Sequence, residues 1–271
     1  MNPKKYVKIL KSIEANSAAY TCPYCGALTY SVSDSFFCSN CEAFIPSAKA
    51  LNQEDTKAAS EIRKLVQSND FAQAEQAYEA LPEYATNPYF AYAEALACIS
   101  ESNYETAQIN YALKGFMEEN TTHRNNSLAA FSKARLLFSK AVYTAKKGIS
   151  GGPETAKYIH AMFMAYMKLG DLKAAHSTLE KTGKLGNILL SEYENMVLKN
   201  GLRDYAGAAN HAERLLSGDL FTLNAAYYLA YAAFKTGKPK EALYVLGSFP
   251  DKSENETVLA LMKEIKSYME I

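Results

Sequence analysis

Residues 224–246 read NAAYYLAYAAFKTGKPKEALYVL and have the pattern of two helices joined by a tight turn. Apolar residues recur three and four positions apart on both sides of the turn, which is the spacing of one face of a helix. Gly237 suits the left-handed residue that ends a helix, and Pro239 suits the first turn of the next helix, because a proline there loses no hydrogen bond. The sequence therefore predicts an antiparallel helix pair in this region.

A turn of this kind recurs along the chain. Each occurrence places a small alanine four residues after a turn-type residue, and the intervals between these alanines are 33, 68, 33 and 34 residues. A period of about 34 residues is typical of helix-turn-helix solenoids, and a small side chain at this position lets the second helix approach the first closely. The turn residues are Asp70, Asn103, Asp171, Asp204 and Lys238, and the alanines are Ala74, Ala107, Ala175, Ala208 and Ala242.

These hairpins resemble the tetratricopeptide repeat (TPR) family. The best matches lie in residues 227–242 and 162–175, while the chain has no Trp and carries Arg203 where the family usually has Gly. The resemblance covers roughly residues 54 to 250. It implies an all-α fold, a TPR-like α-α superhelix of antiparallel helix pairs that occupies residues 51–271.

The repeat pattern is interrupted between residues 115 and 152. Residues 127–147 have the pattern of one uninterrupted helix, and Ala141 lies midway in the double interval, so we interpret this region as a degenerate or fused repeat. We expect loops at residues 118–126 and 148–153. Residues 254–269 predict a final amphipathic helix that caps the last apolar face, as solenoids require.

The four cysteines Cys22, Cys25, Cys38 and Cys41 form two Cys-x-x-Cys knuckles separated by twelve residues. This is a zinc-site pattern, because each knuckle points two sulfurs at one point and Zn²⁺ accepts four thiolates tetrahedrally. Two disulfides would need an oxidising compartment, and a redox-active pair would need a βαβ context. Four thiolates leave no coordination site for water, so we expect Zn²⁺ to be structural.

The residues around the knuckles resemble a small β zinc ribbon over residues 20–48. Residues 27–32 and 35–37 have the character of short strands, and Glu42 follows the second knuckle where the family usually has Gly. We expect a linker at residues 40–53. Residues 1–19 predict a basic helix that carries Lys4, Lys5, Lys8 and Lys11.

Composition narrows the class of protein without naming an activity. The 29 basic and 29 acidic residues cancel, which weakens the case for nucleic-acid binding through bulk charge. Residues 1–11 lack the continuous apolar core of a secretory signal, and no stretch is apolar enough to span a membrane, so we expect a cytoplasmic protein. The four scattered histidines do not form a metal motif, and we expect no enzyme.

The TPR resemblance also implies a concave surface lined by the first helix of each pair. Tyrosine supplies a large contact area with one polar tip, and neighbouring lysines suit a partner with negative charge. The alternative is that these side chains fill contacts between helices. The positions carried over are Tyr89, Tyr92, Lys157, His160, Met164, Lys168, Tyr193, Tyr227, Tyr231, Phe234 and Lys235.

We therefore expect a non-enzymatic adaptor or scaffold that binds a protein or peptide partner in this groove, with the ribbon as a second interaction surface. The alternative is a nucleic-acid- or ribosome-associated factor that uses the ribbon and the N-terminal lysines, although residues 20–48 contain only Asp34 and Glu42 as charged residues. An enzyme whose catalytic groups lie in residues 120–147 is a third reading, for which His123-Arg124 is the only hint. The sequence leaves the oligomeric state open.

Overall fold

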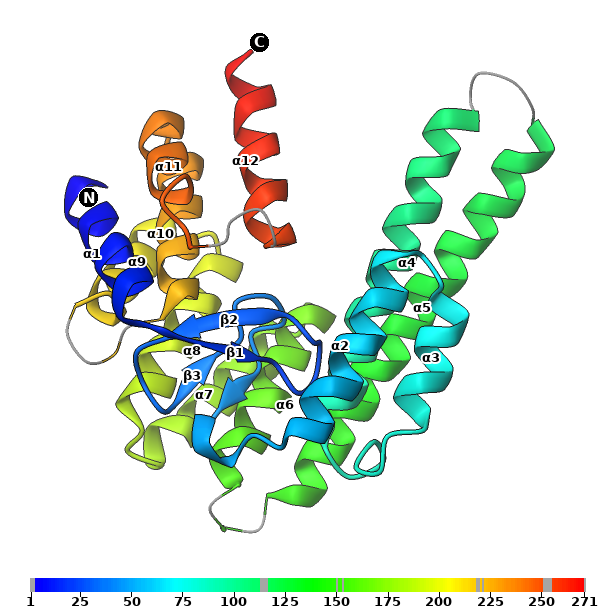
Figure 1. Cartoon of the computed structure of the whole chain (residues 1–271), viewed down its shortest axis with the longest axis horizontal. Coiled ribbons are helices and arrows are strands. Elements are labelled where there is room, and N and C mark those ends of the chain that lie inside the picture. The colour runs from blue at the N-terminus through cyan, green and yellow to red at the C-terminus, as the bar shows by residue number, and fades with distance from the viewer. Residues whose placement is uncertain are drawn as a thin grey trace. The chain divides into compact units, whose positions relative to one another are not determined.

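The computed structural model of the chain describes residues 3–112, 117–149, 151–152, 154–217, 220, 222–250 and 255–270. These residues are mainly helical, which agrees with the expected all-α class (Figure 1). The chain divides into two compact units. We call them the ribbon unit, residues 1–22, 27–51 and 171–271, and the hairpin unit, residues 23–26 and 52–170.

The hairpin unit consists of helices that pack on their neighbours in sequence. Helix α3 packs on α2 and on α4, and α5 packs on α4 and on α6. Alanines such as Ala134 and Ala141 are fully buried, so the long helices approach closely. The helices are α2 (Gln53–Gln67), α3 (Phe71–Glu79), α4 (Pro88–Ala112), α5 (Met117–Gly148) and α6 (Thr155–Leu169).

The ribbon unit contains the remaining helices and all the described strands. Consecutive helices pack from α7 to α12, and the N-terminal α1 packs on α11. Tyr6, Val7 and Leu10 of α1 are buried, whereas its four lysines are exposed. The helices are α1 (Pro3–Asn16), α7 (Leu172–Lys184), α8 (Ile188–Gly201), α9 (Tyr205–Leu215), α10 (Leu223–Lys235), α11 (Pro239–Leu246) and α12 (Glu256–Met269).

The expected strands are present as two small antiparallel sheets. Strand β1 (Ala18–Thr21) pairs with β2 (Leu28–Ser31), and β3 (Phe36–Phe37) pairs with β4 (Phe44–Ile45). The expected linker at residues 40–53 is wrong in its first half, because β4 is buried and its backbone is paired with β3. A short 3₁₀ helix, Ala48–Ala50, then leads to α2.

Four of the five predicted turns share one backbone conformation. The residue before each turn residue has a positive φ: 62° at Asn69, 77° at Gly170, 61° at Arg203 and 81° at Gly237. A left-handed residue ends one helix and leads the chain into the next. The alanines that follow, Ala74, Ala175, Ala208 and Ala242, are at most 1% exposed.

The fifth predicted turn, at Asn103, is wrong. Helix α4 continues through it, and Ala107 is exposed. Ser102, at the position of the left-handed residues, is buried and lies 3.0 Å from Ser127 of α5, hydroxyl to hydroxyl. The long neighbour α5 holds α4 as one helix along this length, so no turn forms.

Helix α5 confirms the uninterrupted helix predicted at residues 127–147 and extends it. The loop expected at residues 118–126 is wrong because these residues belong to α5. The loop expected after Gly148 lies between α5 and α6, although Ser150 and Pro153 are outside the described residues.

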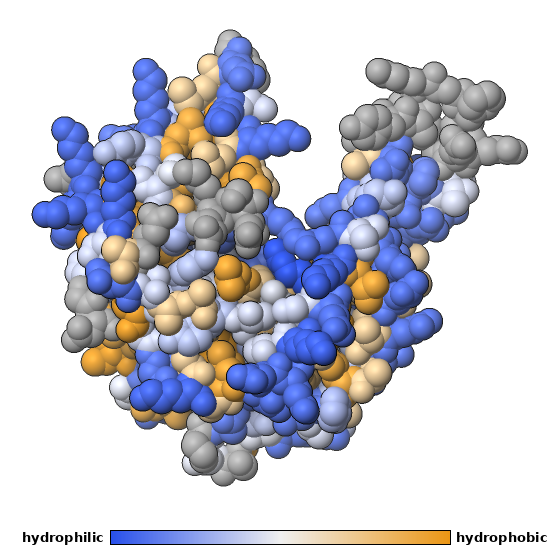
Figure 2. Space-filling view, viewed as in Figure 1, coloured by the Kyte–Doolittle hydropathy of each residue, from blue (hydrophilic) through white to orange (hydrophobic). Residues whose placement is uncertain are grey.

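The expected final helix forms as α12 and packs on α10 and α11. It begins at Glu256 with Asn255 as its N-cap, while Glu254 lies outside the described residues. Among the described residues, none of the helices combines the length and the hydropathy that crossing a membrane requires. On the face drawn in Figure 2, hydrophobic residues lie among hydrophilic ones.

Candidate metal centre and binding groove

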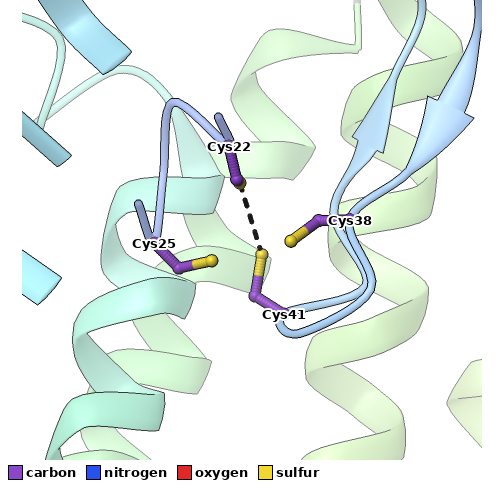
Figure 3. Close-up of side chains that lie close together, drawn as sticks. All are labelled: Cys22, Cys25, Cys38 and Cys41. Carbon is purple, nitrogen blue, oxygen red and sulfur yellow. Dashed lines mark hydrogen bonds between the residues drawn. The ribbon is translucent and has the colours of Figure 1, made fainter. Parts of the chain in front are cut away.

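The four knuckle cysteines come together in one cluster (Figure 3). Their sulfur atoms all lie within 4.8 Å of one another, and the sulfurs of Cys22 and Cys41 are 3.7 Å apart. A zinc ion with Zn–S bonds of about 2.3 Å places its four sulfurs about 3.8 Å apart at the corners of a tetrahedron. The donor set and its spacing therefore fit Zn²⁺.

The two knuckles fold in the same way. The N–H of Cys22 donates to the carbonyl of Ala27, and the N–H of Cys38 donates to the carbonyl of Ala43, each at 2.9 Å. The residue after each second cysteine has a positive φ, 68° at Gly26 and 62° at Glu42. Glu42 thus adopts the left-handed conformation that was expected of a Gly at this position. The presence of Glu in place of Gly therefore leaves the turn intact.

Polar groups around Cys38 support a bound thiolate. The backbone N–H of Asn40 donates to the Cys38 sulfur at 3.4 Å, and the Thr29 hydroxyl donates to it at 3.7 Å. Donors of this kind stabilise a negatively charged sulfur and orient it. When bound, zinc would link the two knuckles and supply structural stability, since four thiolates complete its coordination.

The second knuckle is built into the helices of the ribbon unit. The ring of Phe37 stacks on Tyr193 of α8, with centroids 3.7 Å apart and planes at 11°. The Asn224 side chain of α10 donates to the carbonyl of Cys38 at 3.1 Å. Ribbon and helices therefore share one core in this unit.

Glu42 makes a second connection to the same helices. One oxygen of its carboxylate accepts hydrogen bonds from the hydroxyls of Tyr193, at 2.7 Å, and Tyr228, at 3.0 Å. These two tyrosines belong to α8 and α10. A single carboxylate, next to Cys41 of the cysteine cluster, thus joins two helices.

In the hairpin unit, Tyr24 of the first knuckle is packed by aromatic rings. Its ring centroid lies 4.8 Å from that of Tyr89 and 5.4 Å from that of Phe90. The Tyr78 hydroxyl donates to its carbonyl at 3.4 Å. At Gly26, an added Cβ would collide with the backbone of Ala59, so a close approach and a positive φ both require glycine.

Six of the eleven predicted groove residues are core residues. Tyr193 stacks on Phe37, Tyr92 packs against Phe138, and each of the six is at most 8% exposed. Because the chain's own side chains cover them, they do not line an open groove. They fit the alternative interpretation, in which these side chains fill contacts between helices. They are Tyr89, Tyr92, His160, Met164, Tyr193 and Phe234.

The other five are at least partly accessible. Lys157 pairs with Glu154 at 2.8 Å and Lys235 with Glu264 at 2.9 Å, so the chain already neutralises these two cations. Lys168 is exposed. Tyr227 and Tyr231 are half-buried, and burial, followed by the charge of Glu42, raises the pKa of the Tyr227 hydroxyl.

A groove lies between α9 and α10 beside the accessible tyrosines. Its volume is about 380 Å³. Small side chains on facing helices leave this space open, and the rings of Tyr205 and Tyr231 meet edge to face nearby, with centroids 6.1 Å apart. The residues that line the groove are Tyr205, Ala206, Ala209, Asn210, Glu213, Leu229, Ala232, Ala233, Thr236 and Lys238.

None of the groove-lining residues was among the predicted positions. Half of them lie on α9, the second helix of its pair, and those on α10 lie on another face than the predicted Tyr227, Tyr231 and Phe234. The alanines three residues apart on α9, Ala206 and Ala209, are the signal that could have marked it. Small residues at this spacing create a shallow channel along one helix face.

An acidic cluster lies in the hairpin unit. The carboxylates of Glu75, Glu79 and Glu94 lie within 4.8 Å of one another. Lys133 pairs with Glu75 and lies 3.8 Å from Glu94, and the Tyr84 hydroxyl donates to Glu94. Burial raises the pKa of Glu94 despite these contacts. A lysine already supplies the positive charge here, so we do not assign a metal to the cluster.

Comparisons with protein-family models, with curated proteins and with solved structures each gave no match. The TPR resemblance therefore remains a prediction.

Proposed function

We propose that the chain is a non-enzymatic adaptor that binds a segment of another protein in the groove between α9 and α10. In this proposal the helices form a TPR-like superhelix, and Zn²⁺ bound by the four cysteines is structural. The groove is the observation that carries the proposal, since it is the accessible hollow next to the predicted tyrosines.

The chemistry of the groove suits an apolar side chain flanked by polar backbone. Its floor and walls include four alanines, and Asn210 and Lys238 provide polar groups at its margin. Its volume, about 380 Å³, is that of a small ligand pocket and accommodates a few side chains. A peptide segment would gain apolar contact from the alanines and hydrogen bonds from the margin.

Zinc would stabilise one wall of this groove indirectly, through the second knuckle. Asn224 and Tyr228 of α10 hold the second knuckle through hydrogen bonds, and α10 also forms one wall of the groove. A rigid wall lowers the cost of ordering side chains when a partner binds. The ribbon would thus hold α10, the helix that forms this wall, in a fixed position.

The second candidate is nucleic-acid binding through α1. All four of its lysines are exposed, which is the observation in its favour. In the ribbon itself, however, Lys49 is the one basic residue between residues 17 and 51. Phosphate contacts require several cations, so protein binding is better supported.

A pull-down from native lysate tests the proposal. Ala209→Phe fills the groove without removing a contact, and Ala260→Phe adds the same bulk at an exposed position of α12. We expect the partner to be lost with Ala209→Phe and retained with Ala260→Phe. Identical partner sets for the two variants would contradict groove binding, and recovery of RNA that weakens with salt would favour the second candidate.

A further inference from the structure

Helix α5 carries large apolar side chains on its solvent side. Leu128, Phe131, Leu136 and Tyr143 are 57%, 46%, 73% and 60% exposed. At about 100° per residue they fall within an arc of about 140° on the helix. We call this row the α5 seam. The opposite face, including Ala130, Leu137 and Ala141, is buried.

The seam lies in a strongly basic environment. Residues 121–148 contain six Lys and Arg residues and no Asp or Glu. Four of the cations are exposed, and none of these four has a carboxylate within ion-pair distance among the residues described. The exposed cations are Arg124, Arg135, Lys146 and Lys147.

The remaining two cations, Lys133 and Lys140, contact other groups of the chain. Lys133 faces the acidic cluster and pairs with Glu75 and Glu94. Lys140 lies over the ring of Tyr84 at 3.9 Å. Two of the exposed cations also lie over rings, Lys146 over Tyr166 at 5.8 Å and Lys147 over Tyr143 at 4.3 Å. Arg124 and Arg135 have neither a carboxylate nor a ring partner among the residues described. This charge pattern defines the partner that would complement the seam.

We propose that the α5 seam binds an acidic amphipathic helix of another protein, packed lengthwise along α5. The apolar row spans 16 residues from Leu128 to Tyr143, whose Cα atoms lie about 22 Å apart along the helix axis. Ser132 and Ser139 lie within the row and leave room for side chains of a facing helix. Carboxylates of that helix would pair with Arg124 and Arg135, which at about 100° per residue project within the same arc as the apolar row.

A helix fits the seam better than a flat anionic surface does. The apolar residues lie on one side of a long helix and form a row along its length, which suits packing against a second helix. A lipid bilayer and a second copy of this chain are the competing occupants. A second copy would bring two basic rows together, and like charges would oppose that contact.

The seam and the groove belong to different units, so the two proposals can fail separately. The seam proposal shares with the proposed function only the idea that the chain binds proteins. The result of an experiment on α5 can therefore be interpreted whether or not Ala209→Phe changes which proteins bind in the groove.

Site-specific photo-crosslinking tests the seam. A photo-crosslinking amino acid replaces Leu136 in the full chain in its native host, and the crosslinked residues are mapped by mass spectrometry. The matched control places the same amino acid at Leu202, which is also exposed, at 52%, and lies outside α5. We expect crosslinks from position 136 alone to map to a helix with acidic flanks, and to persist in the Ala209→Phe background.

A synthetic peptide of the mapped segment then tests the chemistry by fluorescence anisotropy. We expect Leu136→Asp and Arg135→Glu each to weaken its binding at least about 10-fold, Leu202→Asp to have no effect, and added salt to weaken binding. Crosslinks to lipid, to a second copy of the chain or to a segment without acidic residues would overturn the proposal, as would the absence of crosslinks at position 136.

Discussion

Glu42 adopts a left-handed backbone conformation to place its carboxylate between two helices. Its φ is 62°, nearly that of Gly26 in the other knuckle. A residue with a Cβ loses about 1–2 kcal/mol in this conformation. Hydrogen bonds from Tyr193 and Tyr228 to its carboxylate contribute about 1.5–3 kcal/mol each, so they offset the strain.

We predict that Glu42→Gly destabilises the protein by about 1–3 kcal/mol, although it restores the residue that suits the turn. The substitution relieves the backbone but leaves two tyrosine hydroxyls without this acceptor. Urea unfolding followed by tyrosine fluorescence gives the change in the free energy of unfolding.

Arg203→Gly is the matched control, because Arg203 has a φ of 61° in an exposed turn of the same unit. It should be neutral or stabilising by up to about 1 kcal/mol. If Glu42→Gly stabilises the protein as much as Arg203→Gly does, the hydrogen bonds from Tyr193 and Tyr228 make no net contribution to the free energy of unfolding.

At the scale of an element, the N-cap of α9 shows how charge fixes a helix start. The Asp204 carboxylate accepts from the N–H of Gly207 at 2.9 Å and lies 3.0 Å from the Lys199 ammonium. The hydrogen bond from Gly207, and then the one from Lys199, lower the pKa of Asp204 below its ordinary value of 3.8. Both contacts favour the charged carboxylate.

We predict that Asp204→Asn lowers the melting temperature at pH 7 and that the difference from wild type shrinks as the pH falls below about 4. The pKa is lower in the folded state, so the charged form stabilises the fold above the unfolded pKa. This contribution is lost as the pH falls through the folded pKa. Asparagine retains the cap but not the charge.

Melting curves of both proteins at several pH values measure this difference. Asp171 offers an internal comparison, because its carboxylate caps α7 in the same way, by accepting from the N–H of Ala174, and has no lysine contact among the residues described. A difference between wild type and Asp204→Asn that is constant down to pH 2.5 would exclude the charge as its origin.

The hairpins also show which elements could be predicted from sequence. Turns at Asp70, Asp171, Asp204 and Lys238 were predicted correctly, since local backbone preference and capping determine them. The turn at Asn103 was wrong because α5, a distant partner, holds α4 continuous through contacts such as Ser102 with Ser127. Such long-range packing overrides a local signal and leaves no trace in the spacing of residues.

At the scale of the whole molecule, the cysteine cluster is connected to the packing of the helices. The sequence alone predicts that zinc removal unfolds residues 20–46 and spares the helices. Contacts of Phe37, Cys38 and Glu42 with α8 and α10 change this expectation for the ribbon unit. Loss of the metal releases the knuckle that these helices pack against.

We predict that a chelator speeds amide hydrogen exchange in the ribbon and in α8 and α10, while α5 exchanges as before. Hydrogen exchange with mass spectrometry, on protein whose zinc content has been measured, checks both regions at once. Unchanged protection of α8 and α10 after complete zinc loss would show that the ribbon is an independent module.

The candidate site was only partly predictable for a related reason. Cysteine spacing predicted that these four residues cluster, because a knuckle is a local structure. The groove positions could not be identified in the same way, since a periodic pattern shows which helix face is apolar but not what covers it. Tyr193 is covered by Phe37, 156 residues away in the sequence, and is fully buried.

A left-handed residue recurs at four of the turns between helices, and it marks where one hairpin could be exchanged for another. Asn69, Gly170, Arg203 and Gly237 share one torsion angle but little chemistry. The turn therefore requires a rotation of the backbone that Asn, Gly and Arg all adopt in this chain, and it does not require one particular side chain. Exchanging whole hairpins between these junctions, cut at the left-handed residue, is then a rational way to build chimaeras of this protein.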